Sequence, residues 1–429
     1  MGNSEASSTA AGDAAFVRTN LRWNFLALSL DYGLFGLGLS LAASTTVLPA
    51  FAQRLGASNL VIGLLPALLT VGWGLPSVFF ANYIERQERK LPMVLAVTVW
   101  ERLPYLLLGL AALYLAAEQP ALTLALMLFL VALGAASGGV IMPAWVEIIA
   151  KVIPVTLRGR YFAFGNIVSG LTGVGGAALV GYFLTIFAYP TNYALCFFAA
   201  FAALAASFVF LAATREHPVR SRKPAVPFAS YLRRLPEVLR RDRDFSAYLA
   251  ARMLSIGGAM ANGFFTVFAL KRLGAGEEQV AVFTFFLLAG QTVSTAVWGQ
   301  LADQRGHKLV LTLGAAASVG ANLVALAATE VWMLYPVFIL MSAAIGAVNV
   351  SHLTIMLEFG PPADRPTYIG LGGTTMAPVA LLVPLVGGLL ADGPGFGAVF
   401  ATAGVLALLS FLCLVFVVRE PRQREKGLG

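Results

Sequence analysis

Long apolar stretches alternate with short polar segments along the whole chain. Twelve of these stretches are long enough to cross a bilayer, since a spanning helix takes about 20 apolar residues. They fall near residues 22–49, 60–82, 92–117, 120–150, 161–188, 192–213, 246–270, 279–301, 309–328, 331–357, 368–390 and 397–418. The pattern predicts an all-α integral membrane protein with twelve transmembrane helices.

The polar segments repeat at half the length of the chain. Leu-Gly-Ala at 55–57 recurs at 273–275, and an acidic residue follows each glycine by 29 residues, at Glu85 and at Asp303. Such a repeat in a membrane protein is typical of secondary transporters built from two pseudo-symmetric halves. The sequence therefore predicts three parts, namely an N-terminal six-helix half (1–213), a basic cytoplasmic linker (214–245) and a C-terminal six-helix half with a short cytoplasmic tail (246–429).

Composition and charge agree with a membrane protein. Hydrophobic residues make up 59% of the chain and charged residues 12%, whereas a soluble domain carries roughly 25% charged residues. Of the 29 Lys and Arg residues, 24 fall in segments that are cytoplasmic if the N-terminus is cytoplasmic. By the positive-inside rule both termini are then cytoplasmic, and we expect a multi-pass protein of the plasma (cell inner) membrane. The net charge of +8 fits an anionic inner leaflet and does not indicate a nucleic-acid partner.

The linker and the cysteines carry less information. In the linker, Leu232, Leu235 and Leu239 lie at helical spacing opposite arginines, which predicts an amphipathic helix on the inner leaflet. A regulatory docking site is the alternative. Cys196 and Cys413 occupy matching places in separate halves, so we expect no disulfide and no metal site. No cofactor is expected either.

The repeated polar segment resembles a known family signature. Gly299-Gln-Leu-Ala-Asp303-Gln-Arg305-Gly306-His-Lys308 is similar to the loop Gly-x-Leu-x-Asp-Arg-x-Gly-Arg-Lys, which joins helices 2 and 3, and again 8 and 9, in the major facilitator superfamily. The first copy, at 81–90, is degenerate, although Arg86, Arg89 and Lys90 remain. The resemblance implies a central cavity lined by helices 1, 4, 7 and 10. It also implies that these loops latch the cytoplasmic side in the outward-open state.

A carboxylate in such a loop can lie against the positive N-terminus of a facing helix, and glycine permits close helix approach. The residues expected to form this cytoplasmic gate are Glu85, Arg86, Arg89, Glu147, Arg158, Arg160, Gly299, Asp303, Arg305, Gly306, Lys308, Glu358 and Arg365. The alternative is that these arginines only enforce topology. A second feature is a series of small residues in the fifth stretch, which the family places against helix 8. Its members are Gly165, Ser169, Gly173, Ala177 and Gly181.

Four charged residues fall inside predicted spans, where each is a functional candidate because charge is costly in a membrane. They are Asp31, Glu101, Arg102 and Arg252. At 1.5 Å per residue, Asp31 lies roughly 11 Å and Arg102 roughly 15 Å from the cytoplasmic end of its helix. Asp31 is either a titrating or substrate-binding residue or one partner of a static salt bridge, and the sequence leaves both open. Weaker candidates for proton coupling or substrate binding are Tyr32, Asn262, Asn349 and His352, with Gln291 undecided.

A nucleotide-driven pump is excluded because the chain has no Gly-x-x-x-x-Gly-Lys-[Ser/Thr] loop, and three scattered histidines do not form an enzyme site. We expect a non-enzymatic, monomeric secondary transporter that moves a small molecule by alternating access, with protons as the coupling ion. An acidic residue in the first helix and few polar cavity residues favour export of amphipathic compounds. An importer of a small nutrient or metabolite, and a non-transporting sensor on a transporter fold, are the alternatives.

Overall fold

The computed structural model describes residues 2–85, 87–218, 242–359 and 365–420. Its helices are α1 (Gly2–Leu41), α2 (Val47–Arg54), α3 (Asn59–Glu85), α4 (Leu91–Leu115), α5 (Pro120–Val152), α6 (Val155–Ile186), α7 (Thr191–Ala212), α9 (Arg243–Gly258), α10 (Phe264–Arg272), α11 (Glu278–Arg305), α12 (His307–Ala327), α13 (Leu334–Phe359), α14 (Arg365–Asp392) and α15 (Phe396–Phe416). Within these residues, 12 helical segments are long and apolar enough to cross a membrane. The predicted fold class is confirmed.

The first helix of each half is broken at the same place, which the sequence did not predict. The apolar stretch 22–49 contains the end of α1 at Leu41 and the start of α2 at Val47, and the stretch 246–270 contains α9, a 3₁₀ turn (Ala259–Ala261) and α10. Long apolar runs hide such breaks because the residues on both sides are equally hydrophobic. The apolar pattern therefore identified these spans without showing that each is interrupted.

The repeated Leu-Gly-Ala marks where α2 and α10 end. Gly56 has φ +82° and Gly274 has φ +69°, a left-handed conformation that glycine adopts without a side-chain clash. The Ala57 amide then donates to the carbonyl of Ala52 at 3.0 Å, which closes the end of α2. The most visible repeat in the sequence is thus a helix-terminating turn, and the acidic loop that follows it belongs to the next polar segment.

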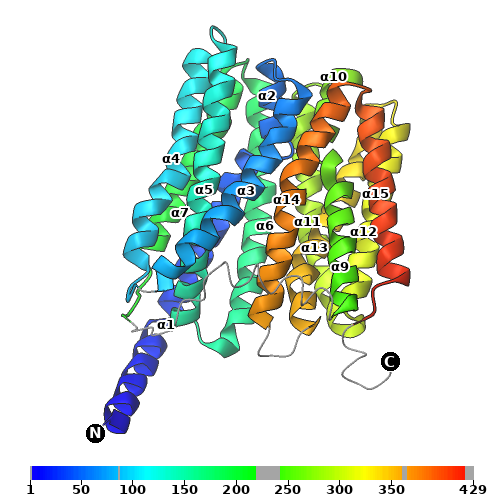
Figure 1. Cartoon of the computed structure of the whole chain (residues 1–429). Coiled ribbons are helices and arrows are strands. Elements are labelled where there is room, and N and C mark those ends of the chain that lie inside the picture. Colours follow the sequence, from blue (N-terminus) through cyan, green and yellow to red (C-terminus); the bar gives the residue numbers. More distant parts are fainter. Residues whose placement is uncertain (1, 86, 219–241, 360–364, 421–429) are drawn as a thin grey trace.

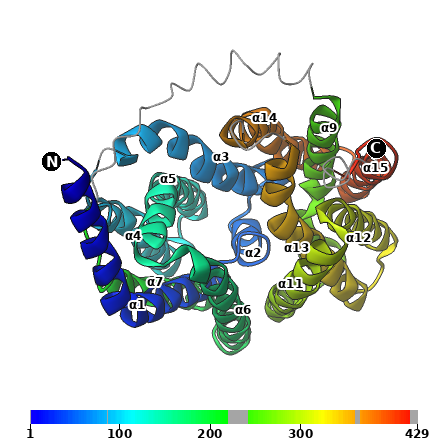
Figure 2. The ribbon, with the colours of Figure 1, turned by 90° about the horizontal axis from the view of Figure 1, so that it is seen from below.

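The two halves repeat the same helix pairings. In the N-terminal half α1 packs on α6 and α7, and α5 packs on α3 and α4; in the C-terminal half α9 packs on α14 and α15, and α13 packs on α11 and α12. Figure 2 shows the halves as two bundles side by side. They meet along α3 with α14 and along α6 with α11. The start of α1 and the end of α15 lie at one end of the molecule, opposite α2 and α10 (Figure 1).

The described hydrogen bonds and ion pairs between the halves gather at the α2/α10 end. Thr46 and Thr284 share a 2.6 Å hydrogen bond between hydroxyls, and Arg54 pairs with Glu277 at 3.0 Å. The carboxylate of Asp392, at the end of α14, accepts the first backbone amides of α3 at 2.9 and 2.8 Å. The α2/α10 end is therefore closed by direct contacts between the halves.

The resemblance implied that the small residues of α6 face α11, but only some of them do. A Cβ on Gly173 or Gly181 would meet Leu288 or Ala281 of α11, at 3.5 and 3.0 Å. A Cβ on Gly165 would instead meet Tyr32 of α1 at 3.0 Å. The series therefore serves two interfaces, because a spacing of four residues drifts around a helix of 3.6 residues per turn.

A close backbone approach between the halves generates a stability prediction. A Cβ on Gly63 of α3 would overlap the carbonyl oxygen of Pro384 in α14, whereas a Cβ on Gly74 of the same helix would meet no described atom within 4 Å. Both replacements by alanine gain the same helix propensity, so their difference isolates the clash. Gly63→Ala should be less stable than Gly74→Ala by about 1–3 kcal/mol, measured by thermal unfolding in detergent. Equal melting temperatures would show that α3 and α14 do not pack this closely.

Candidate functional site

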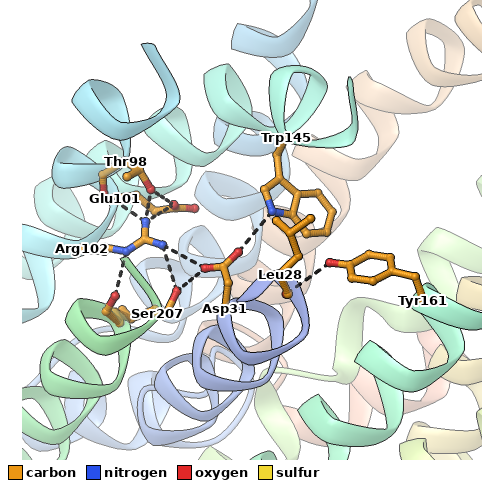
Figure 3. Close-up of polar contacts among 9 residues, drawn as sticks. Leu28, Asp31, Thr98, Glu101, Arg102, Trp145, Tyr161 and Ser207 are labelled. Atoms are coloured by element: carbon orange, nitrogen blue, oxygen red, sulfur yellow. Dashed lines mark hydrogen bonds and ion pairs between the residues drawn. The ribbon is translucent and has the colours of Figure 1, made fainter. Parts of the chain in front are cut away.

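Three of the four charges expected in the membrane form one cluster in the N-terminal half (Figure 3). Asp31 of α1 accepts a hydrogen bond from the Ser207 hydroxyl of α7 at 2.6 Å and one from the Trp145 indole of α5 at 3.3 Å. The Arg102 guanidinium of α4 lies 3.8 Å from the same carboxylate. The cluster thus joins four helices of one half.

Arg102 is the centre of this cluster. Its Nη1 pairs with Glu101 Oε2 at 3.1 Å, and its Nε donates to the Leu204 carbonyl at 2.9 Å. Its Nη2 donates to Ser207 Oγ at 3.0 Å. Only 4% of Arg102 is exposed, and its buried guanidinium is satisfied by two carboxylates, by the hydroxyls of Ser207 and Thr98 and by the backbone carbonyls of Leu204 and Thr98. Breaking a buried pair of this kind leaves an uncompensated charge, which is costly.

Glu101 differs from Asp31 in that it borders an open space. Its Oε2 accepts a hydrogen bond from Thr98 at 3.0 Å, one turn earlier on α4. The residue also lines a cavity of about 210 Å³ within the N-terminal half, otherwise walled mostly by apolar and aromatic side chains that include Phe35, Trp73 and Tyr105. Of the described residues around this cavity, Glu101 is the charged one.

An aromatic stack adjoins Asp31. The Tyr32 and Trp145 rings are stacked with centroids 5.8 Å apart, and Phe162 meets Trp145 edge-on at 6.4 Å. Tyr32 donates to Asn166 Oδ1 of α6 at 2.9 Å. Tyr32 and Trp145 are both half-buried. Because the Trp145 indole also donates to Asp31, the stack is joined to the charged cluster by a hydrogen bond.

The sequence did not single out the neutral members of the cluster. Thr98, Trp145 and Ser207 are polar or amphipathic residues in otherwise apolar spans, and nothing in their spacing connects them. Only Thr98 carried a local signal, because it precedes Arg102 by four residues and so shares its helix face. Ser207 comes from α7, more than a hundred residues away.

The fourth charge, Arg252 of α9, lies in the C-terminal half and lines a different cavity. This cavity, of about 380 Å³, lies between the halves, since Thr45, Pro66 and Thr70 line it together with residues of the C-terminal half. Two of the weaker candidates, Asn262 and Asn349, line it as well. Arg252 donates to Ser255 Oγ at 2.9 Å, and its Nε is buried with no hydrogen-bond partner.

His352 of α13 is held by Tyr248 of α9, another residue that the sequence analysis did not single out. The Tyr248 hydroxyl and His352 Nδ1 are 2.6 Å apart, and the rings are stacked with centroids 6.1 Å apart. His352 is therefore a packed hydrogen-bonding residue in this state. A proton-relay role for His352 stays a hypothesis.

The expected gate residues are spread over the loops opposite the α2/α10 end, and the described ones brace their own half. Lys90, before α4, pairs with Glu147 at the end of α5 at 3.5 Å. His307, the first residue of α12, lies 4.0 Å from Glu358 at the end of α13. Arg158 donates to the carbonyls of Ala150 and Ile153. Lys308 donates to the Val415 carbonyl at 3.4 Å.

Of the remaining gate residues, four are exposed, two are glycines, and three have side chains outside the described residues. Arg89, Arg160, Asp303 and Arg305 are exposed. Gly306 has φ +93° and ends α11. A Cβ on Gly299 would meet no described atom within 4 Å, so the close helix approach expected there is absent from this state. The side chains of Glu85, Arg86 and Arg365 lie outside the described residues.

Comparison with curated proteins finds relatives over part of the chain. Multidrug resistance protein MdtG of Dickeya zeae is 31% identical over 141 residues, which are 32% of this chain and 34% of that protein. A multidrug resistance efflux pump PmrA homologue of Lactococcus lactis is 34% identical over 134 residues, 29% of this chain and 30% of that protein. The chain matches about a third of the length of these relatives.

Solved structures match over nearly the whole chain. A mutant of the nucleoside transporter NupG superposes with a TM-score of 0.73 at 11% identity, covering 91% of this chain and 99% of that one. A D-xylose–proton symporter superposes with a TM-score of 0.68 at 16% identity, covering 94% and 99%. At these identities the likeness shows the fold alone.

The family assignment rests on the sequence itself as well as on the fold. The sequence profile of the Major Facilitator Superfamily matches residues 30–276 and, in a second, overlapping match, residues 247–428. The twelve spans, the repeated helix pairings and the two-bundle arrangement agree with it. The chain belongs to the Major Facilitator Superfamily, a family of multi-pass membrane transporters rather than of enzymes.

Proposed function

We propose that the chain is a proton-coupled secondary transporter that exports amphipathic compounds by alternating access, with Asp31 and Glu101 carrying the coupling proton. The observation that supports this best is the composition of the charged cluster. Two carboxylates, Asp31 and Glu101, share the single guanidinium of Arg102 in the part of the half that spans the membrane. With both carboxylates ionised the cluster has a net charge of −1, and one bound proton makes it neutral.

A charge imbalance of this kind is what coupling requires. A buried net charge is unfavourable in a low-dielectric interior. The cluster therefore favours taking up one proton while it is closed off from water. Groups that interact this strongly titrate as a pair rather than separately. A conformational change that alters the contacts of Asp31 or Glu101 then alters proton affinity, and by linkage proton binding biases the conformation.

The aromatic stack beside the cluster supports amphipathic substrates. Tyr32 and Trp145 offer half-buried ring surface, and Trp145 is hydrogen-bonded to Asp31. A solute bound against these rings would contact Trp145, which is hydrogen-bonded to Asp31, a member of the proposed proton site. The partial relatives named as multidrug resistance and efflux proteins favour export over import.

Orientation follows from the distribution of basic residues. The Lys and Arg residues crowd the segments at the end opposite α2 and α10, so we place this end, with both termini, in the cytoplasm of a cell whose inner membrane holds the protein. The described state is then closed to the outside and inward-facing. In it the loop residues brace their own halves, and their role as a latch belongs to the opposite, outward-facing state.

Removing the Asp31 charge should separate coupling from transport. Asp31→Asn makes the cluster neutral without a proton, so we expect loss of accumulation driven by a pH gradient while passive exchange of solute remains measurable. Proteoliposomes with and without an imposed gradient provide the test, with Glu118→Gln, an exposed carboxylate outside the cluster, as the control. If Asp31→Asn and Glu101→Gln both accumulate solute as the parent does, the proton site lies elsewhere.

Arg102 should be required for folding. Arg102→Ala leaves two carboxylates without their cation, a loss of about 3–5 kcal/mol where the pair is buried. Expression level and melting temperature should therefore fall together. A well-folded Arg102→Ala protein that has lost only transport would assign this residue to the coupling site instead of the scaffold.

The gate hypothesis concerns Asp303. If the loop at 299–308 latches the outward-facing state, Asp303→Asn removes a charge–dipole contact of roughly 0.3–1 kcal/mol and shifts the population toward the inward-facing state. Labelling of an engineered cysteine at Thr70, which lines the cavity between the halves, should then become faster from the cytoplasmic side. If labelling is unchanged both in Asp303→Asn and in the double variant with Glu85→Gln, the latch hypothesis is refuted.

A further inference from the structure

Arg252 is a buried cation without a carboxylate partner among the described residues. It is 7% exposed. One hydrogen bond, to Ser255 Oγ, is made by its Nη1, and its Nε is buried and unpaired. Arg102, equally buried, has two carboxylates within 4 Å. The two membrane arginines are therefore in opposite situations, one fully compensated and one not.

An uncompensated guanidinium in a membrane domain is unfavourable for folding, so its presence calls for a compensating group from elsewhere. Arg252 lines the cavity of about 380 Å³ between the halves, and of the described residues around this cavity it is the charged one. An anion that enters the cavity would supply the missing charge.

A second buried group in the same cavity also lacks its partner. Asn322 of α12 lines the cavity and is 2% exposed; its amide nitrogen donates to the carbonyls of Ser318 and Gly258, at 2.9 and 3.3 Å, while its Oδ1 has no hydrogen-bond partner. The rest of the lining is mainly apolar, with Ser255, Asn262 and Asn349 as further polar residues. The guanidinium of Arg252 is the group that can bind an acidic head, whereas Asn322 Oδ1 is an acceptor and would take a hydroxyl or amide donor elsewhere on the same solute. Such polar groups in an otherwise largely apolar space are typical of a binding site for a polar head on an apolar body.

We propose that Arg252 forms an anion-binding subsite in this cavity, so that the transported amphipathic solute carries an acidic group, a carboxylate or a sulfonate. The guanidinium offers planar, paired donors that match such groups. The proposal rests on the proposed transport function and specifies its substrate class. Asp31 and Glu101 in the N-terminal half carry the proton, and Arg252 in the C-terminal half holds the anion.

The first test is stability. Because Arg252 lacks a compensating partner, Arg252→Gln should unfold at a melting temperature equal to or above that of the parent, in contrast to Arg102→Gln, which should unfold earlier. Arg272→Gln, which removes an exposed arginine at the end of α10, controls for the change in total charge. A fall in the melting temperature of Arg252→Gln as large as that of Arg102→Gln would make Arg252 a structural residue and overturn the proposal.

The second test is binding without any gradient. Naphthoate, naphthalenesulfonate and the neutral isostere naphthamide are titrated into purified full-length protein in neutral detergent and followed by calorimetry. The parent and Arg272→Gln should bind the two anions roughly 10- to 100-fold more tightly than the amide, the usual range for a hydrogen bond to a charged group. Arg252→Gln should lose this preference, and Arg252→Lys should keep part of it.

The possible results separate this inference from the proposed function. Equal binding of anions and amide, no binding of either anion, or a preference that survives in Arg252→Gln would each refute the anion subsite. Transport of neutral or cationic amphipathic compounds driven by a pH gradient would still support proton-coupled export in that case. Conversely, an anion preference that depends on Arg252, without any response to a pH gradient, would support the subsite and refute proton coupling.

Discussion

Charge that is buried in an apolar interior has to be neutralised by nearby groups, and this constraint shapes the N-terminal half. The guanidinium of Arg102 contacts Asp31 of α1, Glu101 of its own helix and Ser207 of α7. These contacts link α1, α4 and α7 around one ion cluster, and α5 joins it through the hydrogen bond from Trp145 to Asp31. Lipid is as apolar as a leucine side chain, so hydrophobic burial gives little force between helices in a membrane, and polar contacts have greater weight.

The two halves share the same helix arrangement but differ in their buried polar groups. Both begin with a broken helix, both end α2 or α10 with a left-handed glycine, and both hydrogen-bond a serine of the sixth helix to the first helix. Ser207 donates to the Asp31 carboxylate, whereas Ser410 donates to the Ala251 backbone carbonyl at 2.8 Å. The N-terminal half thus holds its buried charges in a satisfied cluster, whereas the C-terminal half has Arg252 lining the cavity between the halves without a carboxylate partner among the described residues.

The described polar contacts differ between the two ends of the molecule. At the α2/α10 end they are connected by a few short polar contacts and by backbone approach at Gly63. At the opposite end Lys90–Glu147 and His307–Glu358 link helices within each half. Each half is therefore braced internally at the end opposite α2 and α10.

The fold class and the twelve spans were readable from the apolar pattern, because hydrophobic length is a local property of the chain. The sequence also identified Asp31, Glu101, Arg102 and Arg252 as the charges of interest, since charge in a span is visible without a structure. Which of these charges meet depends on how the helices pack, and this is visible only in the folded molecule. Whether a buried arginine is compensated depends on helices distant in sequence: Ser207 on α7 and Trp145 on α5 complete the cluster around Asp31, while no described carboxylate reaches Arg252. The breaks in the first helix of each half, and the division of the α6 glycines between α1 and α11, were likewise decided by packing, because apolar residues look alike in sequence whatever they contact.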